Sequence, residues 1–452
     1  MKLRKTITTI VATIILLAGW QLFAVIANQP ELIPSLPQLV RTLCELLVSG
    51  NFYQSVGATI LRGILGILIS FICAIGMAGV FARFEWVYEL FRPLLAIMRS
   101  IPVISFILLA LIFLNPESIP LMIAFLTMFP LLTENLTRGI LDLRPGLSIM
   151  ARQFQIKRSN VLFQIIYPQL KPFLYSGLAS ATGFGWRAII MGEVLSQCAF
   201  GIGSEMKKAQ NFIAVPELLA WTIVAVFISF FFDKGISKIS VIIPKISFAS
   251  KDKVIPTLTL SALDTRGISY LYGIRHFSYS FQKGVIYGIS APSGKGKTTL
   301  LNLIGGILSP TEGEIRPTIH FRIATVFQEP LLLSHLTAEE NIMFPLSSFL
   351  TEEKARQIAQ KHLQEMEMEP FRNRYPKELS YGQQQRIAIA RALTYPSPLL
   401  LMDEPFKGLD EALSHRIIRR IQEKQTKEER IILFTSHNPD EIRLLADEVI
   451  RL

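Results

Sequence analysis

The sequence predicts an all-α polytopic membrane domain of about six helices followed by an α/β domain. The chain has 452 residues, more than one ordinary domain needs, and 50% of them are hydrophobic. The apolar residues crowd into long runs before about residue 240, whereas charged and apolar residues mix after it. We therefore predict a membrane domain over 1–240, a linker over 241–257 and an α/β domain over 258–452.

Apolar runs of roughly twenty residues, enough to cross about 30 Å of hydrocarbon as a helix, define the predicted spans. They lie near 7–27, 56–82, 94–114, 117–137, 173–197 and 216–240. The third and fourth runs are separated only by residues 115–117, so we expect a tight hairpin. The first run follows Lys2, Arg4 and Lys5 but lacks a small-residue cleavage site, which favours a retained signal anchor.

The distribution of cationic residues predicts the orientation of the spans. Lys and Arg gather at the N-terminus, around Arg83 and Arg92, and in the long loop after residue 137, and these loops alternate with charge-poor ones. Because cationic loops stay in the cytoplasm, both termini should be cytoplasmic. Membrane orientation therefore explains the net charge of +11 better than nucleic-acid binding does.

Two features of the membrane half have competing interpretations. Residues 145–172 are too polar to span, and their spacing predicts short amphipathic helices at the cytoplasmic surface, with a helix lying on lipid as the alternative. Arg187 and Glu193 lie within the fifth run, where a charge is costly unless it faces a cavity or a partner. We expect one helix face to carry both, with either a pathway role for Glu193 or a structural pair. Pro102 and Pro130 should kink their helices.

The soluble half carries a phosphate-binding loop between a strand and a helix. Strands predicted at 285–290, 322–327, 398–403 and 431–435 alternate with helices, which indicates a mainly parallel sheet. Glycines let the loop fold its N–H groups around phosphates, the Lys reaches the terminal phosphates, and the Thr hydroxyl binds Mg²⁺. The predicted nucleotide-binding residues are Ser293, Gly294, Lys295, Gly296, Lys297, Thr298 and Thr299. The pattern usually begins with Gly, where this chain has Ala291.

An apolar strand ending in two carboxylates supplies the predicted chemistry of hydrolysis. Leu399–Met402 precedes Asp403 and Glu404. Asp403 would hold the magnesium shell, and Glu404 would polarise the attacking water. Adjacent carboxylates are common on protein surfaces, but their place after a phosphate loop makes a catalytic role the better interpretation.

The run Leu379-Ser-Tyr-Gly-Gln383 resembles the signature motif of the ATP-binding-cassette proteins. The resemblance implies that Ser380, Gly382 and Gln383 contact the γ-phosphate held by an opposite subunit, so that two cassettes close head to tail. Tyr381 stands where the family has its first Gly. This departure bears on the geometry of closure and on the rate of hydrolysis.

The same family supplies further residue roles by resemblance. Gln328 matches the residue that senses magnesium and contacts the permease, which adds it to the catalytic and metal-binding sets. Gly408–Asp410 resembles the D-loop, and His437 resembles the switch histidine that contacts the γ-phosphate. An aromatic residue should stack on adenine, and Tyr270 and Tyr272 are both candidates, with Tyr272 entered in the predicted site.

The membrane half resembles permeases of the nitrate, sulfonate, taurine and bicarbonate import family. The resemblance rests on Ile149–Pro168, Gly177, Trp186–Ala188 and Gly192-Glu193. It implies that the cytoplasmic loop is a coupling element that docks into the ATPase. Ile149 and Gln155 stand where that family usually has Glu and Gly.

Together these features predict half of an ATP-binding-cassette importer, with permease and ATPase fused in one chain. We expect an ATP hydrolase that uses ATP and Mg²⁺, lies in the plasma membrane as a multi-pass protein, and has its ATPase domain in the cytoplasm. The expected partners are a second copy or a related half-transporter, an extracytoplasmic solute-binding protein, membrane lipid and a small solute, but not nucleic acid. Nitrate, sulfonates, taurine, bicarbonate and pyrimidine-like solutes all stay open. The alternatives are a degenerate cassette that binds ATP and regulates a partner, and an exporter.

Overall fold

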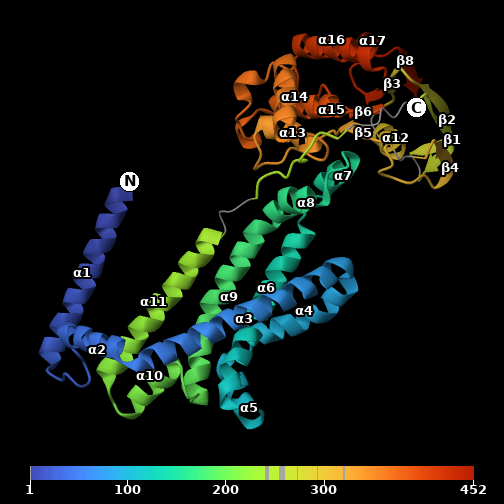
Figure 1. The fold of residues 1–452 in the computed structure, drawn as a ribbon. Coiled ribbons are helices and arrows are strands. Elements are labelled where there is room, and N and C mark those ends of the chain that lie inside the picture. Colours follow the sequence, from blue (N-terminus) through green and yellow to red (C-terminus); the bar gives the residue numbers. More distant parts are fainter. Residues whose placement is uncertain (1, 240–243, 254–259, 272, 293, 319–320) are drawn as a thin grey trace. The chain divides into compact units, whose positions relative to one another are not determined.

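The computed structural model describes residues 2–239, 244–253, 260–271, 273–292, 294–318 and 321–452 (Figure 1). The chain divides into two compact units. We call Met1–Leu143 with Gln169–Ile242 the helical unit, and Arg144–Pro168 with Ile243–Leu452 the cassette unit. A stretch from the middle of the membrane half thus belongs to the compact unit that contains the ATPase residues.

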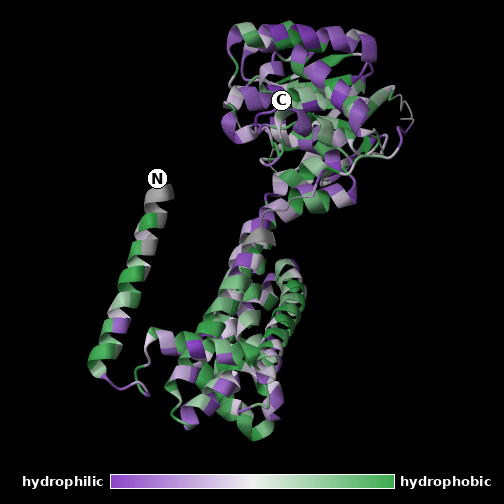
Figure 2. Cartoon of the chain, turned by 60° about the vertical axis from the view of Figure 1, so that its left-hand side comes forward, coloured by the Kyte–Doolittle hydropathy of each residue, from purple (hydrophilic) through white to green (hydrophobic). Residues whose placement is uncertain are grey.

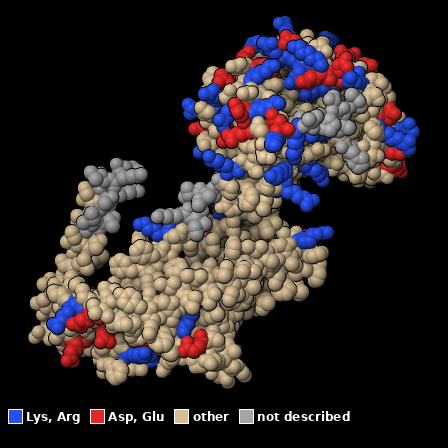
Figure 3. All heavy atoms as spheres, viewed as in Figure 1, with Lys and Arg blue, Asp and Glu red and all other residues tan. Residues whose placement is uncertain are grey.

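The helical unit is built from helices, most of which are rich in apolar residues (Figure 2). They are α1 (Lys2–Ala27), α2 (Leu36–Val48), α3 (Gly50–Arg83), α4 (Glu85–Ser100), α5 (Val103–Phe113), the 3-10 turn η1 (Pro116–Ser118), α6 (Ile119–Leu141), α9 (Tyr167–Ser196), α10 (Ile202–Asn211) and α11 (Val215–Ile239). Each predicted apolar run overlaps one or two of these helices, and residue 240 lies outside the described residues. The surface of the unit in Figure 3 carries few charged side chains.

The number of clear membrane spans is smaller than the predicted six or so. Among the described residues, Gly50–Arg83, Pro116–Leu141 and Val215–Ile236 are long and apolar enough to cross a membrane. The predicted third span is a pair, α4 and α5, bent by 94°, and it counts as a fourth span if the pair crosses together. The break follows from Pro102, because the residue before a proline is pushed out of the helical region, and Ile101 is extended.

Small residues bring the helices of this unit close together. Ala74 and Ala78 of α3 lie in one buried cluster with Ala124 of α6 and Ala181 of α9. A Cβ added at Gly66 would lie 2.8 Å from the Cβ of Ala124, so α3 and α6 approach too closely for a larger side chain. Close backbone approach at small residues is the usual way in which membrane helices pack.

Glu193 is a buried tie between helices rather than a partner of Arg187. Its carboxylate accepts hydrogen bonds from Arg62 Nη1 at 2.7 Å, Thr59 Oγ1 at 2.9 Å and the N–H of Gly203 at 3.0 Å, and its side chain is fully buried. Residues six apart on a helix lie about 120° from each other, so Arg187 faces elsewhere. The expectation that one helix face carries both charges was wrong. These contacts give Glu193 a structural role, and its pathway role stays an untested prediction.

The cassette unit contains the predicted parallel sheet. Its strand order is β5 (Ile323–Val326), β6 (Leu399–Asp403), β7 (Ile431–Thr435), β3 (Ile286–Ser290) and β8 (Glu448–Arg451), and the neighbouring strands pair in parallel. All residues of β6 and β7 are buried, as expected for the centre of a parallel sheet. The sequence did not predict a second, antiparallel sheet of β2 (Ile274–Gln282), β1 (Ala262–Tyr270) and β4 (Glu312–Arg316).

Helices connect the parallel strands. They are α12 (Lys297–Ile304), α13 (Ala338–Leu346), α14 (Glu352–Glu365), α15 (Tyr381–Thr394), α16 (Glu411–Glu428) and α17 (Pro439–Leu445). In a parallel sheet the carboxyl ends of all strands meet at one edge, and ligands bind there. The loops that follow β3, β5, β6 and β7 therefore gather the predicted site residues at one edge.

Candidate nucleotide-binding site

The phosphate-binding loop follows β3 and leads into α12. Gly294 and Gly296 have φ values of +80° and +89°, and a Cβ at Gly296 would lie 2.9 Å from the carbonyl oxygen of Gly273. Both conformation and space therefore require glycine at 296. Ala291 is not among the described residues with positive φ, so its methyl group is tolerated without a left-handed backbone. Its carbonyl oxygen accepts a hydrogen bond from Lys297 Nζ at 2.7 Å.

The other predicted nucleotide-binding residues differ in exposure, and two of them lie outside the described residues. Lys295 has an exposed side chain, and Thr299 is half-buried in the first turn of α12. Ser293 and Tyr272 lie outside the described residues. Tyr270, the other candidate for adenine stacking, lies at the end of β1 and packs against the cassette core.

Thr298 and Asp403 form the oxygen-rich part of the site. Thr298 Oγ1 donates to Asp403 Oδ2 at 2.8 Å, and Thr435 Oγ1 donates to Asp403 Oδ1 at 2.7 Å. Thr298, Asp403 and Gln328 all line one cavity of about 300 Å³. Within the described residues no cluster of three His, Cys, Asp or Glu side chains could hold a metal ion. Mg²⁺ needs no such cluster, since it keeps waters and phosphate oxygens, so Thr298 and Asp403 fit it.

Glu404 and His437 meet at the ends of β6 and β7. Glu404 Oε1 lies 2.7 Å from His437 Nε2, and His437 Nδ1 lies 3.4 Å from Lys297 Nζ. Glu404 has a φ of +48°, and its N–H donates to Thr435 Oγ1 at 3.0 Å. A non-glycine residue held in the left-handed region is uncommon and occurs preferentially at functional sites. The structure therefore brings Glu404 and His437, two of the three predicted catalytic side chains, together beside the phosphate loop.

The signature run forms the N-terminus of α15. Ser380 Oγ accepts from the N–H of Gln383 at 3.3 Å, and Gln383 Oε1 accepts from the N–H of Ser380 at 2.9 Å. This reciprocal capping fixes the first turn, whose N–H groups favour an anion. A Cβ at Gly382 would lie 2.5 Å from the carbonyl oxygen of Gly408, so the signature and the D-loop touch through their backbones.

Tyr381 links three of the predicted loops. Its hydroxyl donates to the carbonyl oxygen of Gln328 at 2.9 Å, and a Cβ at Gly408 would lie 2.8 Å from its ring. Partial burial raises the pKa of Tyr381, and the carboxylates of Glu329 and Glu404 raise it further. The sequence marked Tyr381 as a departure from the family pattern but did not predict these contacts.

Residues Arg144–Pro168, which we call the coupling segment, are part of the cassette core. The segment contains α7 (Pro145–Gln153), α8 (Arg158–Asn160) and the π-helical turn η2 (Val161–Ile166). Met150 and Phe154 are fully buried, and Ile165 is 1% exposed, all within the core of the cassette unit. Helices were predicted here, and protein covers these three apolar side chains, whereas Leu162 and Phe163 of the same segment are exposed.

Arg391 connects the coupling segment to the loop that carries Gln328. Its guanidinium group donates to the carbonyl oxygens of Pro330 and Leu331, each at 2.8 Å, and lies 5.6 Å from the ring centre of Phe154. Burial lowers the pKa of Arg391 to about 10. Sequence reasoning missed this residue, although an arginine within the apolar run 387–393 was the available signal.

Further contacts of the coupling segment involve side-chain amides. Gln153 Nε2 donates to the carbonyl oxygen of Gly305 at 2.7 Å, just after α12. Asn160 exchanges two hydrogen bonds of 2.9 Å with the backbone of Ser247, and Gln164 Nε2 donates to the carbonyl oxygen of Pro244 at 2.6 Å. Residues 244–247, from the predicted linker, therefore lie along the coupling segment.

Comparisons with known proteins agree with this description. Residues 274–407 match the ABC transporter family, and residues 66–233 match the family described as binding-protein-dependent transport system inner membrane component. The chain is 35% identical over 195 residues to the thiamine import ATP-binding protein of Yersinia pseudotuberculosis, covering 40% of this chain and 83% of that protein. It is 36% identical over 185 residues to the glucose import ATP-binding protein of Saccharolobus solfataricus, covering 38% and 52%.

The chain thus spans about half the length of that glucose import protein. A solved dimeric ATP-binding cassette in a post-hydrolysis state, bound to ADP and Pi, is 29% identical, with a TM-score of 0.40, and covers 42% of this chain and 94% of that one.

The fold and the site define a membrane domain joined to a nucleotide-binding ATPase domain of the phosphate-loop class. The chain belongs to the ABC transporter family, and it fuses a binding-protein-dependent permease domain to an ABC ATPase domain. An ABC ATPase domain is the part of such transporters that couples ATP hydrolysis to transport.

Proposed function

We propose that this chain is the ATP-hydrolysing half of an ABC importer that moves a small solute across the plasma membrane into the cytoplasm. One observation carries the proposal. The coupling segment, which continues directly into α6 and α9 along the chain, is buried in the cassette beside the loop of Gln328. Movement of that loop during the ATP cycle would therefore move the coupling segment with it.

The residues at the sheet edge have defined roles in the proposed hydrolysis. The loop N–H groups and Lys297 bind the phosphates, and Thr298 and Asp403 would hold Mg²⁺. Magnesium would supply charge neutralisation on the terminal phosphates. Glu404 orients the attacking water and takes its proton as the new O–P bond forms and the bond to the β,γ-bridging oxygen breaks. His437 holds the Glu404 carboxylate in place and can contact the γ-phosphate.

The proposed active form contains two cassettes. Ser380, Gly382 and Gln383 at the start of α15 would bind the γ-phosphate of ATP held by a second copy or by a related half-transporter. A match to binding-protein-dependent permeases supports an extracytoplasmic solute-binding protein as the partner that delivers the solute. By resemblance, the solute class is the nitrate, sulfonate, taurine, bicarbonate or pyrimidine-like group.

ATP hydrolysis by the purified chain in lipid nanodiscs tests this function. Glu404→Gln should keep ATP binding but lower the turnover by at least about 100-fold, because the water loses its base. Glu411→Gln, which changes a nearby exposed carboxylate of α16, should leave the turnover unchanged. Stimulation of the wild type by a loaded solute-binding protein would support an importer.

Two results would contradict the proposal. Undiminished turnover by Glu404→Gln would remove its catalytic role. ATP binding without any hydrolysis by the wild type would favour the degenerate cassette that binds ATP and regulates a partner.

A further inference from the structure

The described part of the predicted linker lies along the cassette core. We call these residues, 244–253, the docked linker. Its side chains alternate in exposure: Ile246 and Phe248 pack against the cassette core, whereas Lys245 and Ser247 are exposed. Alternation with a period of two is typical of an extended segment that has one face on protein and the other on solvent. The apolar side chains of the docked linker therefore bind it to the cassette.

The backbone of the docked linker bonds to residues 347–351, which we call the α13–α14 loop. The N–H of Ala249 donates to the carbonyl oxygen of Leu350 at 3.2 Å, and the N–H of Lys253 donates to the carbonyl oxygen of Phe349 at 2.9 Å. A connector that only joins two domains needs no such bonds, because a flexible chain satisfies its N–H groups with water. The docked linker is thus held at a fixed place on the cassette.

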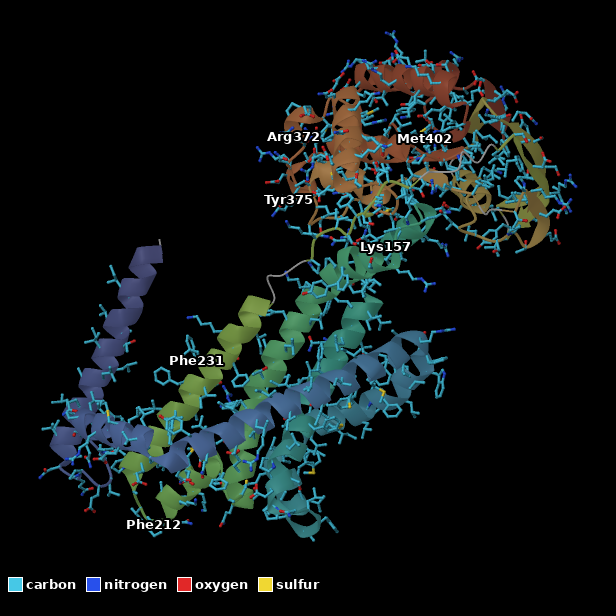
Figure 4. The ribbon with its side chains drawn as sticks, viewed as in Figure 1. Lys157, Phe212, Phe231, Arg372, Tyr375 and Met402 are labelled. Atoms are coloured by element: carbon cyan, nitrogen blue, oxygen red, sulfur yellow. The ribbon has the colours of Figure 1, made fainter. Side chains whose placement is uncertain are left out.

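Asn160 of the coupling segment joins this arrangement and is 1% exposed. Its amide exchanges two hydrogen bonds of 2.9 Å with the backbone of Ser247, and its Nδ2 also donates to Ser347 Oγ at 2.9 Å. Lys157, labelled in Figure 4, donates from its N–H to Ser348 Oγ at 3.1 Å, and its Nζ lies 3.5 Å from Ser247 Oγ. The coupling segment, the docked linker and the α13–α14 loop therefore each bond to the other two. A buried amide with these bonds favours one arrangement of the three segments, because losing a partner leaves polar groups unsatisfied.

The path of the chain gives this three-way contact a mechanical meaning. The coupling segment joins α6 to α9, whereas the docked linker follows α11, which ends at Ile239. Gln164 Nε2 donates to the carbonyl oxygen of Pro244 at 2.6 Å, so the docked linker begins beside the turn that leads into α9. Two separate connections from the helices to the cassette therefore meet on one surface.

We propose that the docked linker is a second coupling element of the transporter. It holds the coupling segment on the cassette and passes cassette movement on to α11. The inference rests on the importer function proposed above and adds how movement leaves the cassette. Asn160 is a positioning residue in this scheme, because it ties the two connections together and acts on the helices through them.

Hydrogen–deuterium exchange of the full chain in lipid nanodiscs, read by mass spectrometry, tests whether the docked linker holds the coupling segment. Ser247→Pro removes the N–H that Asn160 accepts, so amide exchange within the coupling segment should rise at least about tenfold. Ser247→Ala is the matched control, because it keeps that N–H and removes an exposed hydroxyl. Its coupling segment should exchange as in the wild type.

Trapping with MgATP and orthovanadate tests whether movement is passed on. In the wild type and in Ser247→Ala, trapping should change the exchange of the ends of α6, α9 and α11 that adjoin the coupling segment and the docked linker. In Ser247→Pro this response should fall at least about threefold, while the amount of trapped nucleotide stays within about twofold, since residue 247 lies outside the nucleotide site. A merely structural role would lower trapping and response together.

Asn160→Ala removes the same bonds from the other side and should act in the same direction as Ser247→Pro. Arg158→Ala, which changes an exposed side chain of the same short helix, is its control and should match the wild type. If Ser247→Pro does not fold, this second pair of variants carries the comparison.

Two results would overturn the inference: equal exchange of the coupling segment in Ser247→Pro and Ser247→Ala, or a helix response to trapping that persists in full in Ser247→Pro and Asn160→Ala. Failures of the importer function look different. A wild type that traps no nucleotide would refute the proposed hydrolysis, and the exchange without nucleotide would still decide whether the docked linker holds the coupling segment. Trapping in the wild type without any helix response would refute both the coupling and this inference.

Discussion

The nucleotide-binding edge of the cassette and the buried carboxylate of the helical unit assemble in different ways. At the edge, Asp403, Glu404 and His437 lie within two residues of the strands that position them, so the sheet turns local sequence into a site. Glu193 binds Thr59 and Arg62, which lie 134 and 131 residues away along the chain. A parallel sheet brings short sequence motifs together at one edge. The helical unit instead depends on contacts between residues far apart in the chain, which no short sequence pattern predicts.

The largest expected effect concerns the buried carboxylate of Glu193 in the helical unit. Glu193→Ala leaves the guanidinium group of Arg62 without its buried partner, which should lower the free energy of unfolding by about 3–5 kcal/mol. Thermal unfolding in detergent measures the loss. Glu45→Gln breaks the exposed pair of Arg41 and Glu45 and should leave the midpoint unchanged. A Glu193→Ala protein as stable as the wild type would show that this cluster does not hold the helices together.

Phe154→Ala tests whether the coupling segment is anchored in the cassette as firmly as a core residue. The ring is fully buried and makes an edge-on contact with Tyr395 at 5.0 Å between ring centres. Its removal should cost about 3 kcal/mol of unfolding free energy and reduce the stimulation of hydrolysis by a solute-binding protein. Phe163→Ala, in the same segment but 44% exposed, is the control. Equal effects of the two variants would contradict specific docking.

Lys297→Ala tests the nucleotide-binding edge of the cassette. Its expected effect on free energy is smaller than those of the two variants above. Loss of a charged donor to phosphate should weaken ATP binding by about 2–3 kcal/mol, or roughly 30- to 150-fold. Lys295→Ala removes an exposed side chain from a residue whose expected contribution is its backbone, so its ATP affinity should stay close to that of the wild type. Nucleotide titration by fluorescence compares the two. Tight ATP binding by Lys297→Ala would show that the phosphates bind elsewhere.

The same comparison explains what the sequence could predict. The strands, the glycines at 294 and 296 and the carboxylates at 403 and 404 follow from short patterns, because each residue acts close to its neighbours in the chain. The partners of Glu193 and the buried Arg391 could not be predicted, since both depend on contacts between distant segments. The bend within the third apolar run could not be predicted for a related reason: hydropathy at 94–114 records composition, whereas the 94° bend at Pro102 is a matter of backbone geometry.

Tyr381 lies between the two kinds of assembly, because a local motif places it but its contacts are distant. Tyr381→Phe keeps the ring against Gly408 and removes only the bond to the carbonyl oxygen of Gln328. The hydroxyl is partly solvent-exposed, so the change should alter ATP turnover by at most about 1 kcal/mol, or roughly fivefold.

Because the pKa of Tyr381 is raised above its usual value of 10, the hydroxyl stays protonated at neutral and mildly alkaline pH. The ratio of the ATP turnover rates of the wild type and Tyr381→Phe should therefore be constant from about pH 6 to 9. A ratio that changes in this range would mean that Tyr381 ionises during turnover and touches the chemistry directly. A constant ratio near fivefold would instead assign it to positioning the signature run against the loop of Gln328.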